Sequence, residues 1–218
     1  MPIEAEPAAE RTAKPSGDWP LTEAQSGLWY AQRIDPASPI LNTGQYLDIR
    51  GDLDVGLFGA AFAQMAREID ALALRFAETP DGAAQWVDEA HRPALEIVDL
   101  SAEPDPETAA RAAMARDTAT PLDVTRDPLS AFHLYRLSPG RHLFYERIHH
   151  LAIDGYGIVL VTNRLAALYS ALAEGRPAAA APQPLRLSFV VHLVLAALAA
   201  AAVWLVPETS PRVGRIRL

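Results

Sequence analysis

The 218-residue sequence contains no cysteine, and only one of its 19 basic residues, Lys14, is a lysine. Without cysteine the chain can form no disulfide bond, no thiol nucleophile and no thiolate ligand for a metal. The formal net charge is −8 and the sequence pI is near 5.2, so we expect no binding to nucleic-acid phosphates. These absences fit a reducing compartment.

The amino-terminal residues lack the basic start and the apolar core of a secretory signal. The chain opens on Met-Pro-Ile-Glu-Ala-Glu, and residues 1–17 are rich in proline, alanine and glutamate. This composition is typical of disordered segments. We therefore predict a disordered N-terminus at 1–17, an ordered region that begins near residue 18, and a cytoplasmic location.

Acidic and basic side chains are also missing from residues 187–206, where only His192 could carry a charge. A helix of about 20 such residues spans a bilayer core of about 30 Å. The composition predicts a hydrophobic helix that anchors the chain in a membrane; an alanine-rich helix buried against protein is the alternative. A Pro/Ala linker at 177–186 precedes this segment, and a basic tail at 207–218 follows it.

Hydrophobic spacing before the linker predicts a mixture of helices and strands, and therefore an α+β fold. The longest predicted helix, at 54–76, is based on seven apolar residues that recur every three or four positions: Val55, Phe58, Phe62, Met65, Ile69, Leu72 and Phe76. Further helices are predicted at about 22–30, 106–118 and 156–173, and strands at 45–50, 85–88, 95–98, 129–137 and 142–149. Turns are predicted at 80–82 and 138–141.

One segment, His149-His150-Leu151-Ala152-Ile153-Asp154-Gly155, combines residue types that can perform acid–base chemistry. It follows a predicted strand, and neighbouring strand residues point to opposite faces, so only one of the two histidines can face a given cavity. A neutral imidazole can take a proton from an attacking amine, hydroxyl or thiol. Asp154 can fix the loop by accepting backbone hydrogen bonds or by pairing with an arginine. Gly155 can supply a positive φ or a close backbone approach.

Two other interpretations of the histidine pair are open at this point. A core histidine beside an ordinary turn produces the same pattern, and it is the more common origin of an isolated His-His pair. A metal site would need a third ligand, and none stands at a sensible spacing. The surrounding segments are needed to decide.

The spacing His-His-x-x-x-Asp-Gly resembles the active-site motif of the condensation domains of nonribosomal peptide synthetases and of the related chloramphenicol acetyltransferases. Residues 21–29 resemble the opening motif of condensation domains, with its Ala-Gln and Leu-Trp elements. Residues 68–76 resemble the second motif but lack its usual arginine and threonine. This variant, together with residues 128–133 and 145–148, is similar to siderophore-type synthetases such as enterobactin synthase. The resemblance covers about residues 19–176.

The resemblance implies a fold and a set of roles. Residues 18–176 would form the N-terminal lobe of a condensation domain, a two-layer α/β sandwich with the chloramphenicol-acetyltransferase-like fold. Two such lobes form a V around a tunnel, in which a carrier-bound acyl donor meets an amine. His150 would be the catalytic residue, as a base or as the group that positions the amine, supported by His149, Asp154 and Gly155. The implied partners are peptidyl or aryl carrier proteins, whose phosphopantetheine holds the substrates, with no cofactor bound directly.

A complete domain of this family is much longer, and nothing after residue 184 resembles its second lobe. We therefore expect a partial condensation domain with little amide-forming activity alone. The alternatives are a self-associating acyltransferase with sites between subunits and a non-enzymatic module tethered to a membrane through 187–206. In the family the partner of Asp154 is an arginine, which we expect from the second lobe; Arg147 or Arg164 could substitute, or the loop could stay exposed.

Overall fold

The structure is a computed structural model that describes residues 19–177. The segments predicted at 1–17, 187–206 and 207–218 lie outside the described residues, as does the predicted linker after Pro177. The elements, in chain order, are β1 (Trp19–Pro20), α1 (Glu23–Ile34), β2 (Asn42–Arg50), α2 (Val55–Glu68), the 3-10 helix η1 (Asp70–Ala73), β3 (Leu74–Thr79), β4 (Gly82–Val87), the 3-10 helix η2 (Glu89–His91), β5 (Leu95–Asp99), α3 (Pro106–Thr118), β6 (Ser130–Ser138), β7 (Arg141–His149) and α4 (Gly155–Ala173).

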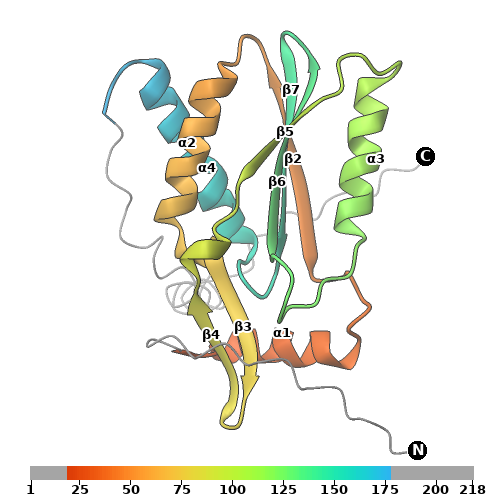
Figure 1. Ribbon diagram of the computed structural model, residues 1–218, viewed down its shortest axis with the longest axis vertical. Helices are drawn as coiled ribbons and strands as arrows, with labels where there is room; N and C mark the ends of the chain where they lie inside the picture. The colour runs from red at the N-terminus through yellow and green to blue at the C-terminus, as the bar shows by residue number, and fades with distance from the viewer. Residues whose placement is uncertain (1–18, 178–218) are drawn as a thin grey trace, which may run out of the picture.

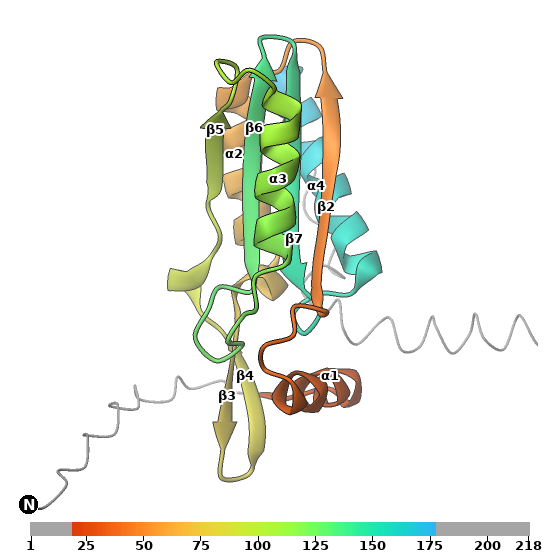
Figure 2. The ribbon, with the colours of Figure 1, turned by 90° about the vertical axis from the view of Figure 1, so that its right-hand side faces the viewer.

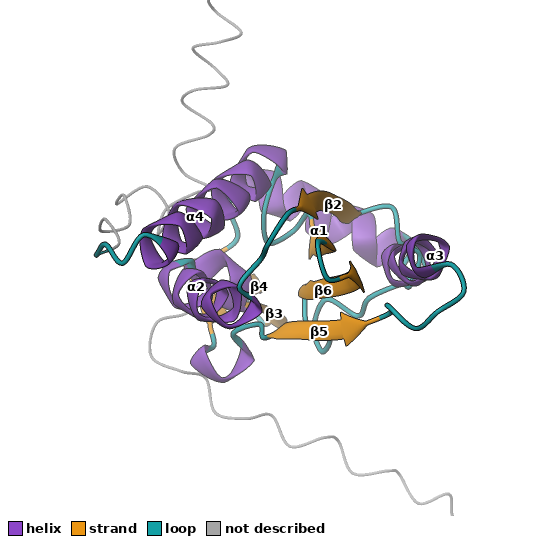
Figure 3. Cartoon of the chain, turned by 90° about the horizontal axis from the view of Figure 1, so that it is seen from above, coloured by secondary structure: helices purple, strands orange, loops and turns teal. Residues whose placement is uncertain are grey.

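A four-stranded sheet with the order β2-β7-β6-β5 forms the centre of the molecule. Its strands pair antiparallel except for the parallel pair β5–β6. Helices α2 and α4 cover one face and α3 covers the other (Figures 1 and 3). A smaller sheet, β1-β4-β3, lies with α1 at one end of the main sheet (Figures 1 and 2). The predicted mixed α and β fold is confirmed.

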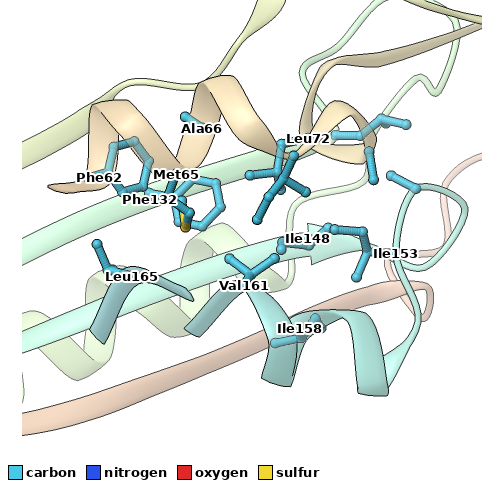
Figure 4. Packing of buried hydrophobic residues seen from close by; sticks show 14 of the residues in the cluster. Phe62, Met65, Ala66, Leu72, Phe132, Ile148, Ile153, Ile158, Val161 and Leu165 are labelled. Atoms are coloured by element: carbon cyan, nitrogen blue, oxygen red, sulfur yellow. The ribbon is translucent and has the colours of Figure 1, made fainter. Parts of the chain in front are cut away.

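Strand β7 is buried on both faces because helices cover each side of it. Phe144 and Ile148 belong to the large hydrophobic core with α2 and α4, whereas Leu143 and Tyr145 pack with α3 in a second, smaller core. This follows from the alternation of side chains along a strand. Figure 4 shows side chains of α2, β6 and α4 meeting in the large core.

The helix predicted at 54–76 is shorter than expected. Helix α2 ends at Glu68, where Ile69 adopts an extended backbone (φ −110°, ψ 96°), and the chain continues through η1 into β3. Phe76 therefore lies in a strand. The helix-like spacing of apolar residues continues past the end of α2 because Ile69, Leu72 and Phe76 are all buried in the same core. Burial produces apolar residues at these positions whatever the backbone does, so spacing alone could not locate the break.

The starts of several helices match their predictions because local signals mark them, although α1 continues to Ile34, past the end predicted at about residue 30. Helix α3 spans the predicted residues, and Asp105 caps it by accepting a hydrogen bond from the Thr108 N–H at 3.1 Å. Helix α1 begins at a capping box formed by Thr22 and Gln25. Helix α4 is followed by Gly175, whose φ of 64° ends the helix as a left-handed residue. The predicted turns connect β3 to β4 and β6 to β7.

Among the described residues, α4 is the one helix that is long and apolar enough to cross a membrane by length and composition. It also has a place in the core: Ile158, Val161, Leu165 and Leu168 are each at most 2% exposed. Packing against the sheet and α2 therefore accounts for its apolar composition.

Gly44 in β2 allows α3 to approach the sheet closely, and we predict that Gly44→Ala destabilises the fold. A Cβ at this position would lie 2.4 Å from the Thr118 hydroxyl oxygen, which is hydrogen-bonded to Tyr145 at 2.8 Å. We expect a loss of about 1–3 kcal/mol in the free energy of unfolding, measured with urea.

Two matched variants test this explanation. Thr118→Ala should cost less in the Gly44→Ala background than in the wild type, because it removes the clashing hydroxyl. Gly59→Ala in α2, where a Cβ meets nothing within 4 Å, should leave stability unchanged or raise it by up to about 1 kcal/mol. A Gly44→Ala protein as stable as the wild type would contradict the prediction.

Candidate active site

The two histidines of the motif stand where β7 ends, and the loop after them is anchored in the core. Leu151, Ala152 and Ile153 are 0%, 2% and 1% exposed and belong to the large hydrophobic core. The His149 N–H donates to the Leu129 carbonyl at 2.8 Å. The loop between strand and helix is therefore fixed by apolar packing and backbone hydrogen bonds on each side of His150.

His149 is the buried member of the pair, with 1% of its surface exposed. Its Nδ1 accepts the Leu151 N–H at 3.1 Å, and its Nε2 lies 3.2 Å from the side-chain oxygen of Gln32. Nδ1 accepts, so the proton of the neutral ring must be on Nε2. Burial, together with the charges of Arg147 and His150, lowers the pKa of His149 to about 4. His149 is therefore neutral near pH 7 and holds the loop.

His150 is partly exposed, and its ring is oriented by its own loop. Its Nδ1 lies 3.1 Å from the Ile153 carbonyl oxygen, and its backbone N–H donates to the Leu41 carbonyl at 2.8 Å. A carbonyl only accepts, so Nδ1 carries a proton and the neutral ring has its lone pair on Nε2. No described residue forms a hydrogen bond with this Nε2. The two histidines therefore face different surroundings, as strand alternation predicts, and their catalytic and supporting roles stay predictions.

Asp154 acts as the N-cap of α4. Its Oδ1 accepts the Gly157 N–H at 2.7 Å, and the residue is partly exposed. Both arginines considered as local partners bind other carboxylates: Arg147 pairs with Asp117 at 3.1 Å and Arg164 with Glu68 at 2.6 Å. The hydrogen bond to the backbone was one of the two roles expected from the sequence. Pairing with an arginine of a second lobe stays a prediction.

The conformational reason given for Gly155 is wrong. Among the described glycines only Gly51, Gly82 and Gly175 have a positive φ, and a Cβ on Gly155 would meet nothing within 4 Å. The bend is made by the extended backbone of Asp154, after which Gly155 simply begins α4. The close approach occurs at Gly157, where a Cβ would lie 2.8 Å from Ile153. A supporting role of Gly155 towards a substrate stays a prediction.

Three buried polar residues near the motif were not selected from the sequence. Gln25 and Gln32 of α1 are 1% and 5% exposed, and Glu146 of β7 is 2% exposed. The Ala-Gln element of the opening motif contains Gln25, but nothing in the sequence pairs Gln32 with His149. Burial raises the pKa of Glu146, and hydrogen bonds from Thr162, at 2.8 Å, and Gln45 only partly oppose it.

The site therefore combines a partly exposed imidazole, fixed by a rigid loop, with a neutral buried imidazole that supports it. Such an arrangement fits general-base chemistry. A model of the condensation-domain family matches residues 16–194. The chain belongs to the condensation-domain family. It matches part of a condensation domain, and its relatives include nonribosomal peptide synthases. The match extends past the boundary predicted at residue 176.

Curated relatives of this condensation domain are large synthases, of which it covers a small part. It is 41% identical over 158 residues to a dimodular nonribosomal peptide synthase of Bacillus subtilis, and these cover 72% of this chain and 7% of that protein. It is 42% identical over 164 residues to an isonitrile lipopeptide synthase of Streptomyces coeruleorubidus (73% and 11%). It is 33% identical over 165 residues to enterobactin synthase component F of Shigella flexneri (75% and 13%).

Solved condensation domains have the same fold. The starter condensation domain of rhizomide synthetase is similar with a TM-score of 0.70 and 38% identity, and the match covers 76% of this chain and 40% of that one. The first condensation domain of the calcium-dependent antibiotic synthetase gives a TM-score of 0.69 and 38% identity, with coverage of 77% and 40%. The chain thus spans less than half of each solved chain.

We predict that Asp154→Ala lowers the free energy of unfolding by about 1 kcal/mol because it removes the cap of α4. Asp154→Asn and Asp154→Ser keep an oxygen that can accept the Gly157 N–H, so both should stay close to the wild type. Urea unfolding of the four proteins at pH 7 is the measurement. An Asn variant as unstable as the Ala variant would instead show that the negative charge is required, as in an ion pair.

Acid should destabilise the protein through His149. Its pKa is about 4 in the folded chain and about 6.5 when unfolded, so the unfolded state binds more protons between these values. Stability is therefore fully present above pH 6.5 and is lost as the pH falls towards 4, by roughly 3 kcal/mol for this group. Urea unfolding between pH 7.5 and 4.5 measures the loss.

The contribution of His149 to this loss of unfolding free energy is the difference between the wild-type curve and that of His149→Gln. The comparison is needed because burial also lowers the pKa of the buried His142, which adds a loss in the same direction. His91→Ala, at an exposed histidine paired with Asp88, is the control and should keep the wild-type loss. Parallel curves for wild type and His149→Gln would contradict the assignment.

Proposed function

We propose that this chain supplies the histidine-bearing half of an active site that transfers an acyl group from a carrier-bound thioester to an amine, with His150 as the base. The observation that carries the proposal is the state of the His150 ring: its Nδ1 is hydrogen-bonded to the Ile153 carbonyl at 3.1 Å. This contact leaves the lone pair on Nε2, which no described residue binds. A base must offer such a lone pair to its substrate.

In the proposed step, the amine nitrogen attacks the thioester carbonyl while Nε2 of His150 accepts the proton that the nitrogen loses. The C–N bond forms, the C–S bond breaks, and the proton passes to the departing sulfur. The contact with Ile153 keeps Nδ1 protonated throughout, so the ring can become an imidazolium without turning. General-base catalysis of this kind contributes about 100- to 10,000-fold in rate.

The proposal concerns a half site, because the match covers only 40% of the solved rhizomide and calcium-dependent antibiotic synthetase chains. In the family a second lobe forms the other wall. A single wall leaves the thioester in contact with water, which weakens electrostatic interactions and permits hydrolysis. We therefore expect slow amide formation by this chain alone and faster formation once a second lobe is added. The missing lobe and carrier proteins bearing phosphopantetheine-linked substrates are the proposed partners.

A graft tests the function directly. The matching part of the rhizomide synthetase starter condensation domain is replaced by residues 19–177 of this chain, and the full-length chain is assayed in parallel. A double mutant of that starter domain has been solved with C8-CoA and Leu-SNAC, which serve as donor and acceptor in the assay. We expect the graft to form the amide product, detected by mass spectrometry, much faster than the isolated chain does.

His150→Ala in the graft should lower the rate by about 100- to 10,000-fold. His91→Ala, which changes an exposed histidine bound to Asp88 at 2.7 Å, is the matched control and should keep the rate. A graft that folds and is equally active with His150→Ala would overturn the proposed base. Robust amide formation by the isolated chain would instead overturn the half-site proposal.

Self-association and membrane attachment remain the alternatives. Light scattering of the full-length chain decides the first, because sites between subunits need an oligomer. Partition of the full-length chain between soluble and membrane fractions decides the second. A cytoplasmic location, with attachment through residues 187–206, is likewise a proposal.

A further inference from the structure

Helix α1 has a buried stripe that faces the histidine motif. Gln25, Trp29 and Gln32 are 1%, 3% and 5% exposed, and their spacing of four and three places them on one face of the helix. Figures 1 and 2 show α1 lying across the end of the main sheet at which β7 terminates. Glutamine is mostly exposed in proteins, so two buried glutamines on one face need polar partners.

The side-chain amide of Gln32 has partners that fix which way it points. Its Nε2 donates to the carbonyl of Ser38 at 3.2 Å and makes longer contacts of 3.4 Å with the carbonyls of Asp35 and Pro36. Carbonyl oxygens only accept, so Nε2 must be on that side and Oε1 must face His149. Oε1 can only accept as well, so Nε2 of His149 must donate to it. The loop after α1 thus determines the tautomer of His149.

The tautomer of His149 in turn holds the residue after His150. With Nε2 protonated, Nδ1 is free to accept the Leu151 N–H at 3.1 Å. The carbonyl of Leu151 accepts from Nε2 of Gln25 at 3.2 Å, and Gln25 also exchanges hydrogen bonds of 2.8 Å with Gln85 of β4. Both the N–H and the C=O of Leu151 are therefore held by groups that depend on α1.

We propose that Gln32 is a positioning residue, which acts through the tautomer of His149 to hold the Leu151 N–H and with it the orientation of His150. Gln25 holds the other side of the same residue. The inference deepens the proposed function and rests on it for the role of His150. Gln32 itself does not touch the reacting groups.

The arrangement requires a neutral His149. A second proton would occupy Nδ1 and place an N–H donor against the Leu151 N–H, so the hydrogen bond would be lost. The charged or titratable neighbours acting on His149 are Arg147 of β7 and His150, and both disfavour a positive charge. The residue of α1 that faces His149 is Gln32, which is neutral. A carboxylate at position 32 would reverse this balance, although it has nearly the same shape as the amide.

Gln32→Glu is therefore the decisive variant. The experiment uses the full-length chain with ¹⁵N-labelled histidine, and long-range ¹H–¹⁵N correlation spectra report the tautomer and the protonation of each ring during a pH titration. In the wild type we expect His149 as the Nε2–H tautomer down to about pH 5. In Gln32→Glu the midpoint of His149 should rise by at least about one pH unit, and the His150 signals should shift once His149 is charged.

Asn163→Asp, which adds the same negative charge at an exposed position of α4, is the matched control and should change neither histidine. An unchanged His149 midpoint in folded Gln32→Glu would overturn the proposal. The wild-type spectrum is a test even if that variant does not fold, because an Nδ1–H tautomer of His149 would overturn it too.

Activity of the graft separates this inference from the proposed function. Gln32→Glu in the graft should lower kcat at pH values below the raised His149 midpoint, with KM little changed, and the loss should diminish as the pH rises above that midpoint. A graft without amide-forming activity, in a chain whose His149 behaves as predicted, would end the proposed function and leave the positioning role intact. An active graft, in a chain whose His149 midpoint does not respond to Gln32→Glu, would end the positioning role and leave the proposed function intact.

Discussion

The structure depends on one strand, β7, whose two faces are both buried. Because side chains alternate along it, Phe144 and Ile148 enter the core with α2 and α4, and Leu143 and Tyr145 enter the core with α3. A central strand with its neighbours on both sides has little freedom to shift. The motif begins at its last residue, His149, so the position of the motif follows from the packing of the sheet.

The burial of β7 also explains the chemistry of its polar residues. Arg147 is 6% exposed and is compensated by Asp117, which also accepts the Tyr145 hydroxyl at 2.8 Å. Glu146, on the other face, accepts hydrogen bonds from a hydroxyl and an amide but pairs with no cation among residues 19–177, and burial raises its pKa. His149 is kept neutral for the same reason. His150, one position further, escapes this environment because it lies beyond the strand and is partly exposed.

Residues distant in sequence complete the site. Helix α1 lies more than a hundred positions before the motif, yet Gln25 and Gln32 bind Leu151 and His149 directly. The loop is held from below by this helix, from the core by Leu151 and Ile153, and at its end by the Asp154 cap. His150 differs from these residues, because no described residue forms a hydrogen bond with its Nε2. This division suits a base whose remaining partner is a substrate.

Much of this molecule could be predicted from local signals in its sequence. The helix at 106–118, the start of α1, and the strand–loop–helix context of His149 to Gly155 depend on residues close together in the chain, and these predicted elements were confirmed. Strand alternation also predicted that the two histidines face different surroundings, and His149 is buried whereas His150 is partly exposed. The end of α2 at Glu68, the open space at Gly155, the pairing of Arg147 and Arg164 with acids elsewhere, and the contact of Gln32 with His149 were decided by tertiary structure alone. Each depends on which segments pack together, and the type of a buried residue does not indicate which distant residue it contacts.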